Sequence, residues 1–434
     1  MDEFVEDALS QSLKARPYYS GFEEAHDTYN ALSKASDGKI YYVLSSESID
    51  HGGQVHVYDP QKDEIKFLGD LTDICGEKNL KAIPQGKSHV EFYEMNGKLY
   101  FGTHIGYYEM IDGIERLPQH PPKGYSLYPG GHIISYDLAT RKFEDLATVP
   151  GGEGILTMTV DHDRGHIYGI TWPYGNFINY NSNTKELKNH GFISAKGEAG
   201  TPGSDYRVLC RSLFVDPNNG RVYGSTAEGN IFFYDPVHEA IQSLANVSLR
   251  LDYFGSYDFT YPGSMGYNWR KILWYAPEGV AYGVHGNSGY LFRFDTTTQV
   301  ITIVDRITSE PSKRSGMFDL FTYGYLGFQL GPDGHTLYYL TGAPIFENGK
   351  RVVGEDKILV GAKGLENLHL VTYDLPARKY TDHGPIFYED GSRPTYVNSI
   401  AVGDDGYVYS LARFEYKEKI IQDLVKISHA LTLK

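Results

Sequence analysis

Short runs of apolar residues recur along the chain, each opened by a turn glycine and each with a tyrosine near its centre. Examples are "GKLYF" from Gly97, "GRVYG" from Gly220 and "GYVYS" from Gly406. In most copies a second apolar run follows and ends in a turn, as in "FYDP" from Phe233. Short aromatic and aliphatic runs bounded by turn formers predict β-strands rather than helices.

The two kinds of run belong to one larger unit that the chain repeats. The segment 212–244, "SLFVDPNNGRVYGSTAEGNIFFYDPVHEAIQSL", reads as four strands in succession. Units of four strands at a regular spacing are typical of β-propellers, in which each unit forms one blade around an axis. The repeat therefore predicts an all-β fold, a seven-bladed β-propeller of four-stranded antiparallel blades. Its seven turn glycines are Gly38, Gly97, Gly165, Gly220, Gly279, Gly334 and Gly406.

The series of units also defines the domain organisation. No linker interrupts it, so we expect one propeller domain over 21–434, preceded by an N-terminal extension, 1–20, of undefined structure. The last unit has a weak third strand, and the N-terminal segment is the candidate to supply a strand that closes the ring. The units are longer than four strands require. We expect the additional residues to form loops, at 105–130, 183–207, 240–270 and 341–368.

Composition and charge exclude several classes of protein. With 37 Tyr, 21 Phe and 48 Gly in 434 residues, the chain reads as a folded, turn-rich β protein. Its formal net charge of −15 argues against a nucleic-acid partner, which would require a basic face. No stretch is apolar enough to span a membrane, and the acidic start lacks the apolar core of a signal peptide. Two cysteines provide no disulfide framework.

A predicted hairpin places two histidines together. The pair Asn96-Gly97 is a strong signal for a type I′ turn, which requires positive φ at both central residues. Directly opposed residues on the two strands hold their Cβ atoms about 5 Å apart. From this turn we expect three opposed pairs: Met95 with Lys98, Phe92 with Phe101, and His89 with His104.

Alignment of the units predicts that other polar residues share a rim with this hairpin. The aligned positions are Asn30, His89, Leu156, Arg211, Lys271, Leu326 and Asn398. His89, Arg211 and Lys271 are the three potential cations, and Asn30 and Asn398 are either ligand-binding or simply solvated. Aromatic side chains that could contact a sugar ring are Trp172, Tyr174 and, in the long loop before the fifth unit, Tyr253.

These groups suit the β-elimination of a uronic acid polymer. Removal of the C5 proton requires groups that neutralise the adjacent carboxylate, a base at C5 and an acid at the leaving C4 oxygen. Arg211, with His89 beside it, can bind the carboxylate, His104 can act as the base, and a tyrosine, with Tyr253 as the first choice, can act as the acid. The division of base and acid among His89, His104 and the tyrosines stays open. Neither a nucleophile nor a metal is needed. A hydrolase would need a pair of carboxylates, whereas most acidic residues here recur at turn positions.

The sequence also resembles a known family. The segments "IPQGKSHVEFYEMNGKLYFGTHIG", "YPGGHIISYDLATRKFEDL", "RGHIYGITWPYGNFINYN" and "CRSLFVDPNNGRVYGST" resemble the seven-bladed propeller lyases typified by ulvan lyases and by enzymes that cleave rhamnose–glucuronate linkages. By motif, the resemblance implies His89 and His104 as the catalytic histidine pair, Arg211 as the arginine and Tyr253 as a tyrosine. A second family tyrosine corresponds to Tyr174 or Tyr180.

The resemblance carries further expectations. It implies a structural Ca²⁺ or Zn²⁺, although no ligand set with a recognisable spacing is visible. It implies export to the periplasm or the extracellular space. Because the sequence as given shows no signal peptide, we expect either that a leader was removed or that the protein stays in the cytoplasm. We expect a monomer that acts on an acidic polysaccharide. Two alternatives to a lyase remain, a non-catalytic propeller that binds a glycan or a protein, and a rhamnosidase.

Overall fold

The structure is a computed structural model that describes residues 13–26, 29–111, 113–262, 265–286, 288–315, 327–343, 346–347, 350–351, 367–395 and 397–428. This part of the chain is built from β-strands, with only short helical turns, which confirms the all-β prediction. The helical turns are α2 (Leu71–Ile74), η1 (Pro150–Gly152), η2 (Gly197–Ala199), η3 (Asp252–Phe254) and α3 (Glu310–Ser315).

Five of the sheets contain four antiparallel strands each, hydrogen bonded in chain order. The first sheet consists of β2 (Leu32–Lys34), β3 (Ile40–Leu44), β4 (Gln54–Asp59) and β5 (Glu64–Asp70). The second consists of β6 (Tyr93–Met95), β7 (Lys98–Gly102), β10 (His132–Asp137) and β11 (Lys142–Thr148). The third consists of β12 (Gly154–Asp161), β13 (His166–Trp172), β14 (Asn176–Asn181) and β15 (Glu186–Phe192).

The next two sheets repeat the same plan. The fourth consists of β16 (Phe214–Val215), β17 (Val222–Ser225), β18 (Asn230–Asp235) and β19 (Ala240–Ser248), which are the four strands predicted for 212–244. The fifth consists of β20 (Trp269–Tyr275), β21 (Val280–His285), β22 (Tyr290–Asp295) and β23 (Val300–Arg306). Two short hairpins lie in the predicted long loops, namely β8 (Glu109–Ile111) with β9 (Ile114–Arg116) and β26 (Phe346–Glu347) with β27 (Lys350–Arg351).

The remaining strands form one eight-stranded sheet that contains the four-strand plan twice. Its first half consists of β24 (Phe328–Leu330), β25 (Thr336–Ala343), β28 (Asn367–Asp374) and β29 (Lys379–Tyr388). Its second half consists of β30 (Ala401–Val402), β31 (Val408–Tyr416), β32 (Lys419–Ile427) and the N-terminal strand β1 (Leu13–Pro17). β1 pairs antiparallel with β32 and parallel with β29, and it thereby joins the two halves.

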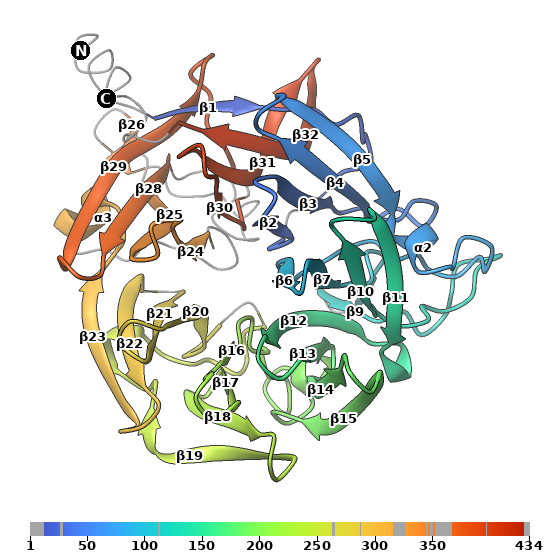
Figure 1. The fold of residues 1–434 in the computed structure, drawn as a ribbon, viewed down its shortest axis with the longest axis horizontal. Helices are drawn as coiled ribbons and strands as arrows, with labels where there is room; N and C mark the ends of the chain where they lie inside the picture. Colours follow the sequence, from blue (N-terminus) through green and yellow to red (C-terminus); the bar gives the residue numbers. More distant parts are fainter. Residues whose placement is uncertain are drawn as a thin grey trace.

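The sheets are arranged in a ring, with their first strands towards the centre and their last strands at the periphery (Figure 1). Burial follows this arrangement, because every residue of the inner strand β12 is buried whereas the outer strand β11 is largely exposed. Aromatic side chains fill the space between neighbouring sheets. Phe177 packs 5.0 Å from Tyr234, and Tyr58 packs 5.6 Å from Tyr409, measured between ring centroids. The second of these contacts joins the first sheet to the last.

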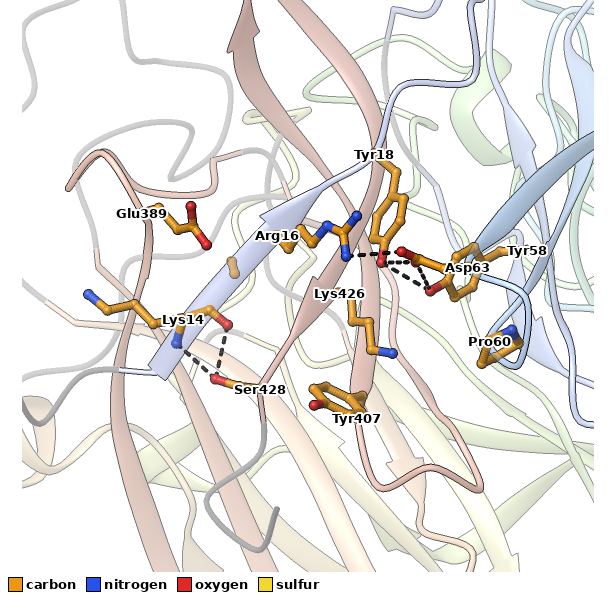
Figure 2. A pocket seen from close by; sticks show the side chains of 11 residues that line it. Lys14, Arg16, Tyr18, Tyr58, Pro60, Asp63, Glu389, Tyr407, Lys426 and Ser428 are labelled. Carbon is orange, nitrogen blue, oxygen red and sulfur yellow. Dashed lines mark hydrogen bonds and ion pairs between the residues drawn. The ribbon is translucent and has the colours of Figure 1, made fainter. Parts of the chain in front are cut away.

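The N-terminal segment binds the first sheet as well as the last. Tyr18 and Tyr58 both donate hydrogen bonds to Oδ1 of Asp63, at 2.6 and 2.7 Å, and Arg16 forms an ion pair with the same carboxylate at 3.1 Å. Figure 2 shows these side chains converging beside β1, where they line a cavity of about 310 Å³. Asp63 lies in the turn between β4 and β5 of the first sheet, whereas β1 belongs to the last sheet. The N-terminal segment therefore links the first sheet to the last.

Candidate functional site

The predicted hairpin forms around Asn96 and Gly97, which both have positive φ, 54° and 72°. Met95 pairs with Lys98, as expected. The rings of Phe92 and Phe101 lie 4.8 Å apart, so these side chains also meet as predicted. The turn therefore sets the register of β6 and β7 in the way that the sequence indicates.

Beyond the hairpin, the predicted backbone register is wrong. The backbone partner of His104 is Lys87, and the two residues exchange hydrogen bonds of 2.8 and 2.9 Å. Residues 88–92 leave the ladder, and the amide of Phe92 donates to Oγ of Ser33 instead. Two extra residues on this side of the hairpin shift the pairing, so His89 reaches His104 from a segment outside the strands. Their rings still meet, at 4.3 Å between centroids.

Aromatic side chains surround the two imidazoles. The ring of Tyr29 lies 4.0 Å from that of His89, and Trp172 and Tyr108 lie 5.3 and 6.3 Å from His104. His104 is only 1% exposed. Gly154 allows this packing, because a Cβ there would lie 2.6 Å from Cδ2 of His104. The histidine pair is therefore enclosed by Trp172 at the end of β13, by Tyr108 between β7 and β8, and by Tyr29 in the segment before β2.

The surroundings fix the protonation state of His104. Its Nδ1 lies 2.8 Å from the carbonyl oxygen of Ile105, which can only accept, so Nδ1 carries the hydrogen in the neutral ring. Nε2 then bears the lone pair, and it has no hydrogen-bond partner among the described residues. Burial, with added repulsion from Lys87 and Arg211, lowers the pKa of His104 to about 3. Burial also lowers the pKa of His89, as do the neighbouring His104, Lys87, Arg211 and Arg270.

A completely buried lysine lies beside the pair. The ammonium of Lys87 donates to the hydroxyl oxygen of Tyr29 at 2.8 Å and to Oε1 of Glu47 at 2.9 Å. It also lies 4.8 and 4.6 Å from the ring centroids of Tyr29 and Tyr108. Sequence reasoning missed Lys87 because it assumed an unbroken ladder, although the residue stands only two positions before His89.

Arg211 reaches the same site from the segment before β16. Its Nη2 lies 2.7 Å from Oε1 of Glu198, and Nε1 of Trp172 donates to the other oxygen of that carboxylate at 2.9 Å. The amide of Leu209 also donates to Oε1 of Glu198. Glu198 therefore positions Arg211 and Trp172 together. Sequence reasoning missed it, because it lies in an insertion without a repeat motif.

In the fifth sheet, the cation that lies near His89 is one residue before the one that the alignment of units indicated. A register shift in β20 between Trp269 and Lys271 makes Arg270 the residue that lies close enough to lower the pKa of His89. Lys271 instead forms an ion pair with Glu91. A one-residue shift moves a side chain to the other face of a strand, which explains why Arg270, and not the aligned Lys271, lies near His89.

Positively charged side chains gather around the histidine pair. Lys87 pairs with Glu47 and Arg211 pairs with Glu198, and Arg270 lies close enough to His89 to lower its pKa. Lys271 and Glu91 form a separate ion pair. A cluster of cations favours an anionic ligand.

Two of the predicted aromatic residues lie away from the pair. Tyr253 is 41% exposed and packs 5.1 Å from Tyr290, and no described hydrogen bond or ring contact joins it to either histidine. Tyr174 is also 41% exposed, stacks 6.1 Å from Phe192 and lines a cavity of about 320 Å³. This cavity adjoins the site, because its wall includes Pro173, which directly follows Trp172.

The asparagines keep their predicted rim positions before the inner strands. Asn30 directly follows Tyr29, and its buried Oδ1 has no hydrogen-bond partner among the described residues. Asn398 is 6% exposed and precedes β30. Leu326, the remaining aligned residue of the sixth unit, lies outside the described residues.

The described residues contain no group of three or more His, Cys, Asp or Glu side chains placed to hold a metal ion. The structural Ca²⁺ or Zn²⁺ that the resemblance implies stays a prediction. Within the same ranges, no helix has the length and apolar character needed to cross a membrane. Neither a protein-family model nor a curated protein sequence matches the chain.

Proposed function

We propose that the protein is a polysaccharide lyase that cleaves a uronic-acid-containing glycan, built on a seven-bladed β-propeller. The fold proposal is supported by the strand order. The five four-stranded sheets and the two four-strand halves of the eight-stranded sheet make seven equivalent groups around the ring (Figure 1).

The observation that carries the enzymatic proposal is the imidazole of His104. Its Nδ1 is fixed by the carbonyl oxygen of Ile105, and its Nε2 is a lone-pair nitrogen on a ring that lies near the cations Lys87 and Arg211. A base of this kind next to cations is what β-elimination requires, because the C5 proton becomes acidic only when the neighbouring carboxylate is neutralised.

The roles follow from this arrangement. Arg211 and Arg270, with His89, bind the uronate carboxylate. Nε2 of His104 takes the C5 proton, the electron pair forms the C4–C5 double bond, and the C4–O bond breaks as a tyrosine protonates the departing oxygen. The low pKa of His104 belongs to the site without ligand, and a bound carboxylate raises it by stabilising the protonated ring. Uronate linked to rhamnose is the substrate that the sequence resemblance favours.

A second candidate is a non-catalytic glycan-binding propeller. The near-complete burial of His104 favours it, as does the exposed pair of Tyr174 and Phe192 beside the adjoining cavity. Exposed aromatic faces beside a cavity can stack on sugar rings without any chemistry.

Product analysis separates these candidates. We expect incubation with ulvan or with gum arabic to produce the ultraviolet absorbance of an unsaturated uronate, whose new double bond is conjugated with the carboxylate. This signal should disappear in His104→Ala and in Arg211→Ala and persist in the control His238→Ala, whose side chain is 70% exposed and faces Asp235. Binding without any product would support the glycan-binding candidate, and release of saturated reducing sugar would indicate a rhamnosidase.

A further inference from the structure

Tyr29 stands at one end of a row of three rings. It precedes β2, and its ring lies 4.0 Å from that of His89, which in turn lies 4.3 Å from the ring of His104. Its ring therefore contacts the imidazole to which we assign carboxylate binding, and that imidazole contacts the one to which we assign proton removal. An acid that protonates the leaving oxygen must lie near the base, because both act on adjacent carbon atoms of one sugar ring.

Lys87 constrains the hydroxyl group of Tyr29. An ammonium can only donate hydrogen bonds, so the oxygen of Tyr29 accepts from Lys87 at 2.8 Å and the phenol hydrogen must point elsewhere. When that proton is transferred, the adjacent ammonium stabilises the resulting phenolate. The interaction is strong because Lys87 is 0% exposed and water cannot screen it.

The other tyrosines near the site lack this combination. The hydroxyl of Tyr108 lies 3.4 Å from Nδ1 of His104, a nitrogen whose hydrogen already bonds to Ile105. Tyr253 packs against Phe254 and Tyr290, with ring centroids 5.6 and 5.1 Å away. Among the tyrosines that the structure describes, Tyr29 is the one whose ring contacts His89 and whose oxygen also accepts a hydrogen bond from a buried cation.

We propose that Tyr29 is the catalytic acid of the lyase and that Lys87 is a positioning residue that orients its hydroxyl group and stabilises its phenolate. The assignment rests on the function proposed above. As the C5 proton passes to Nε2 of His104, the C4–O bond breaks and the leaving oxygen receives the proton of Tyr29. The phenolate and the imidazolium then return to their starting states by exchanging one proton, directly or through water. Among the described residues, the charged and titratable groups around Tyr29 include Lys87, Glu47, His89 and, beyond Glu47, His26.

The test compares two substrates in one variant. Tyr29→Phe keeps the ring and removes the acidic proton, so we expect kcat on a natural uronate polymer to fall about 100-fold or more, with little change in KM. On a synthetic uronide with a 4-nitrophenoxy group at C4, which leaves as 4-nitrophenolate without protonation, we expect kcat to fall less than about tenfold. The ratio of the two losses in kcat does not depend on the folded fraction of the variant. Tyr416→Phe is the matched control, because Tyr416 lies in β31 and its ring packs against Tyr19.

Lys87→Met tests the positioning role through the pH profile. Without the ammonium the phenol holds its proton more tightly, so we expect the alkaline limb of kcat to move to higher pH. Lys188→Met, which removes an exposed pair with Glu239, should leave the limb in place. If the alkaline limb of the kcat profile stays in place in Lys87→Met, the positioning role proposed for Lys87 is wrong.

The outcomes distinguish this assignment from the proposed function. Wild-type protein that is inactive on every uronate polymer overturns the lyase proposal and the assignment together. Active wild-type protein with an equally active Tyr29→Phe variant overturns the assignment alone. Equal losses on both substrates also overturn it, because they would show that the ring of Tyr29 matters and its proton does not.

Discussion

A buried histidine next to two carboxylates makes the stability of the protein depend on pH. His132 in β10 has a side chain that is only 4% exposed, with Nδ1 2.9 Å from Asp145 and Nε2 2.8 Å from Glu77. Burial alone would lower its pKa, but the hydrogen bonds to the two carboxylates outweigh burial and raise the pKa to about 9. The imidazolium is thus the stable form in the folded protein at neutral pH.

The size of the effect follows from linkage. An unfolded histidine has a pKa of about 6.5, and each pH unit between that value and about 9 corresponds to about 1.4 kcal/mol. Because the pKa is raised on folding, protonation contributes about 3 kcal/mol to the free energy of unfolding. This contribution is fully present below pH 6.5 and is lost as the pH rises through about 9.

Denaturant unfolding of wild type and His132→Gln between pH 6 and pH 10 measures this contribution. Glutamine cannot gain a proton, so we expect the difference in free energy of unfolding between the two proteins to shrink by about 3 kcal/mol across this range. Subtraction removes the contribution of groups that both proteins share. Parallel curves for wild type and variant would refute the reasoning, as would an NMR titration that shows His132 neutral at pH 7.

Two further changes test the packing. Asp63→Gly keeps the positive φ of 53° but removes the acceptor shared by Tyr18 and Tyr58. We therefore expect thermal unfolding to show that the free energy of unfolding falls by about 1 kcal/mol. An unchanged transition would show that the cluster in Figure 2 does not hold the N-terminal segment. Gly106→Ala places a Cβ against the carbonyl oxygen of Ser46 and Cα of Gly86, both backbone atoms, so we expect a loss of about 2 kcal/mol or more in denaturant unfolding. Wild-type stability in Gly106→Ala would mean that this close approach relaxes without cost.

The strands could be predicted from the sequence because their signals are local. The turn at Asn96-Gly97 requires positive φ, and the four strands of 212–244 are each bounded by turn formers. The meeting of the rings of His89 and His104 followed from the same turn. Alternation of side chains and turn geometry are properties of a few neighbouring residues, so a single sequence contains them.

The rest of the site depends on irregularities that no local pattern reports. Two extra residues after Lys87 bring it opposite His104, and a bulge in β20 exchanges the places of Arg270 and Lys271. Glu198 acts through tertiary contacts to Trp172 and Arg211, from a loop without a motif. Bulges and inserted loops are where a repeat departs from its period, and here they bear much of the chemistry.

The position of β1 between β29 and β32 has a consequence for how the protein folds during synthesis. The amide of Lys14 bonds to the side chain of Ser428, 414 residues later in the sequence, so the ribosome delivers one partner long before the other. The five four-stranded sheets can each form from neighbouring residues as they emerge, but β1 has no partner strand until β29 emerges, and its other edge stays open until β32 arrives. The nascent chain therefore spends most of its synthesis as an open arc with unpaired strands at its ends, and this is the period in which a chaperone or a second copy of the chain could pair with them.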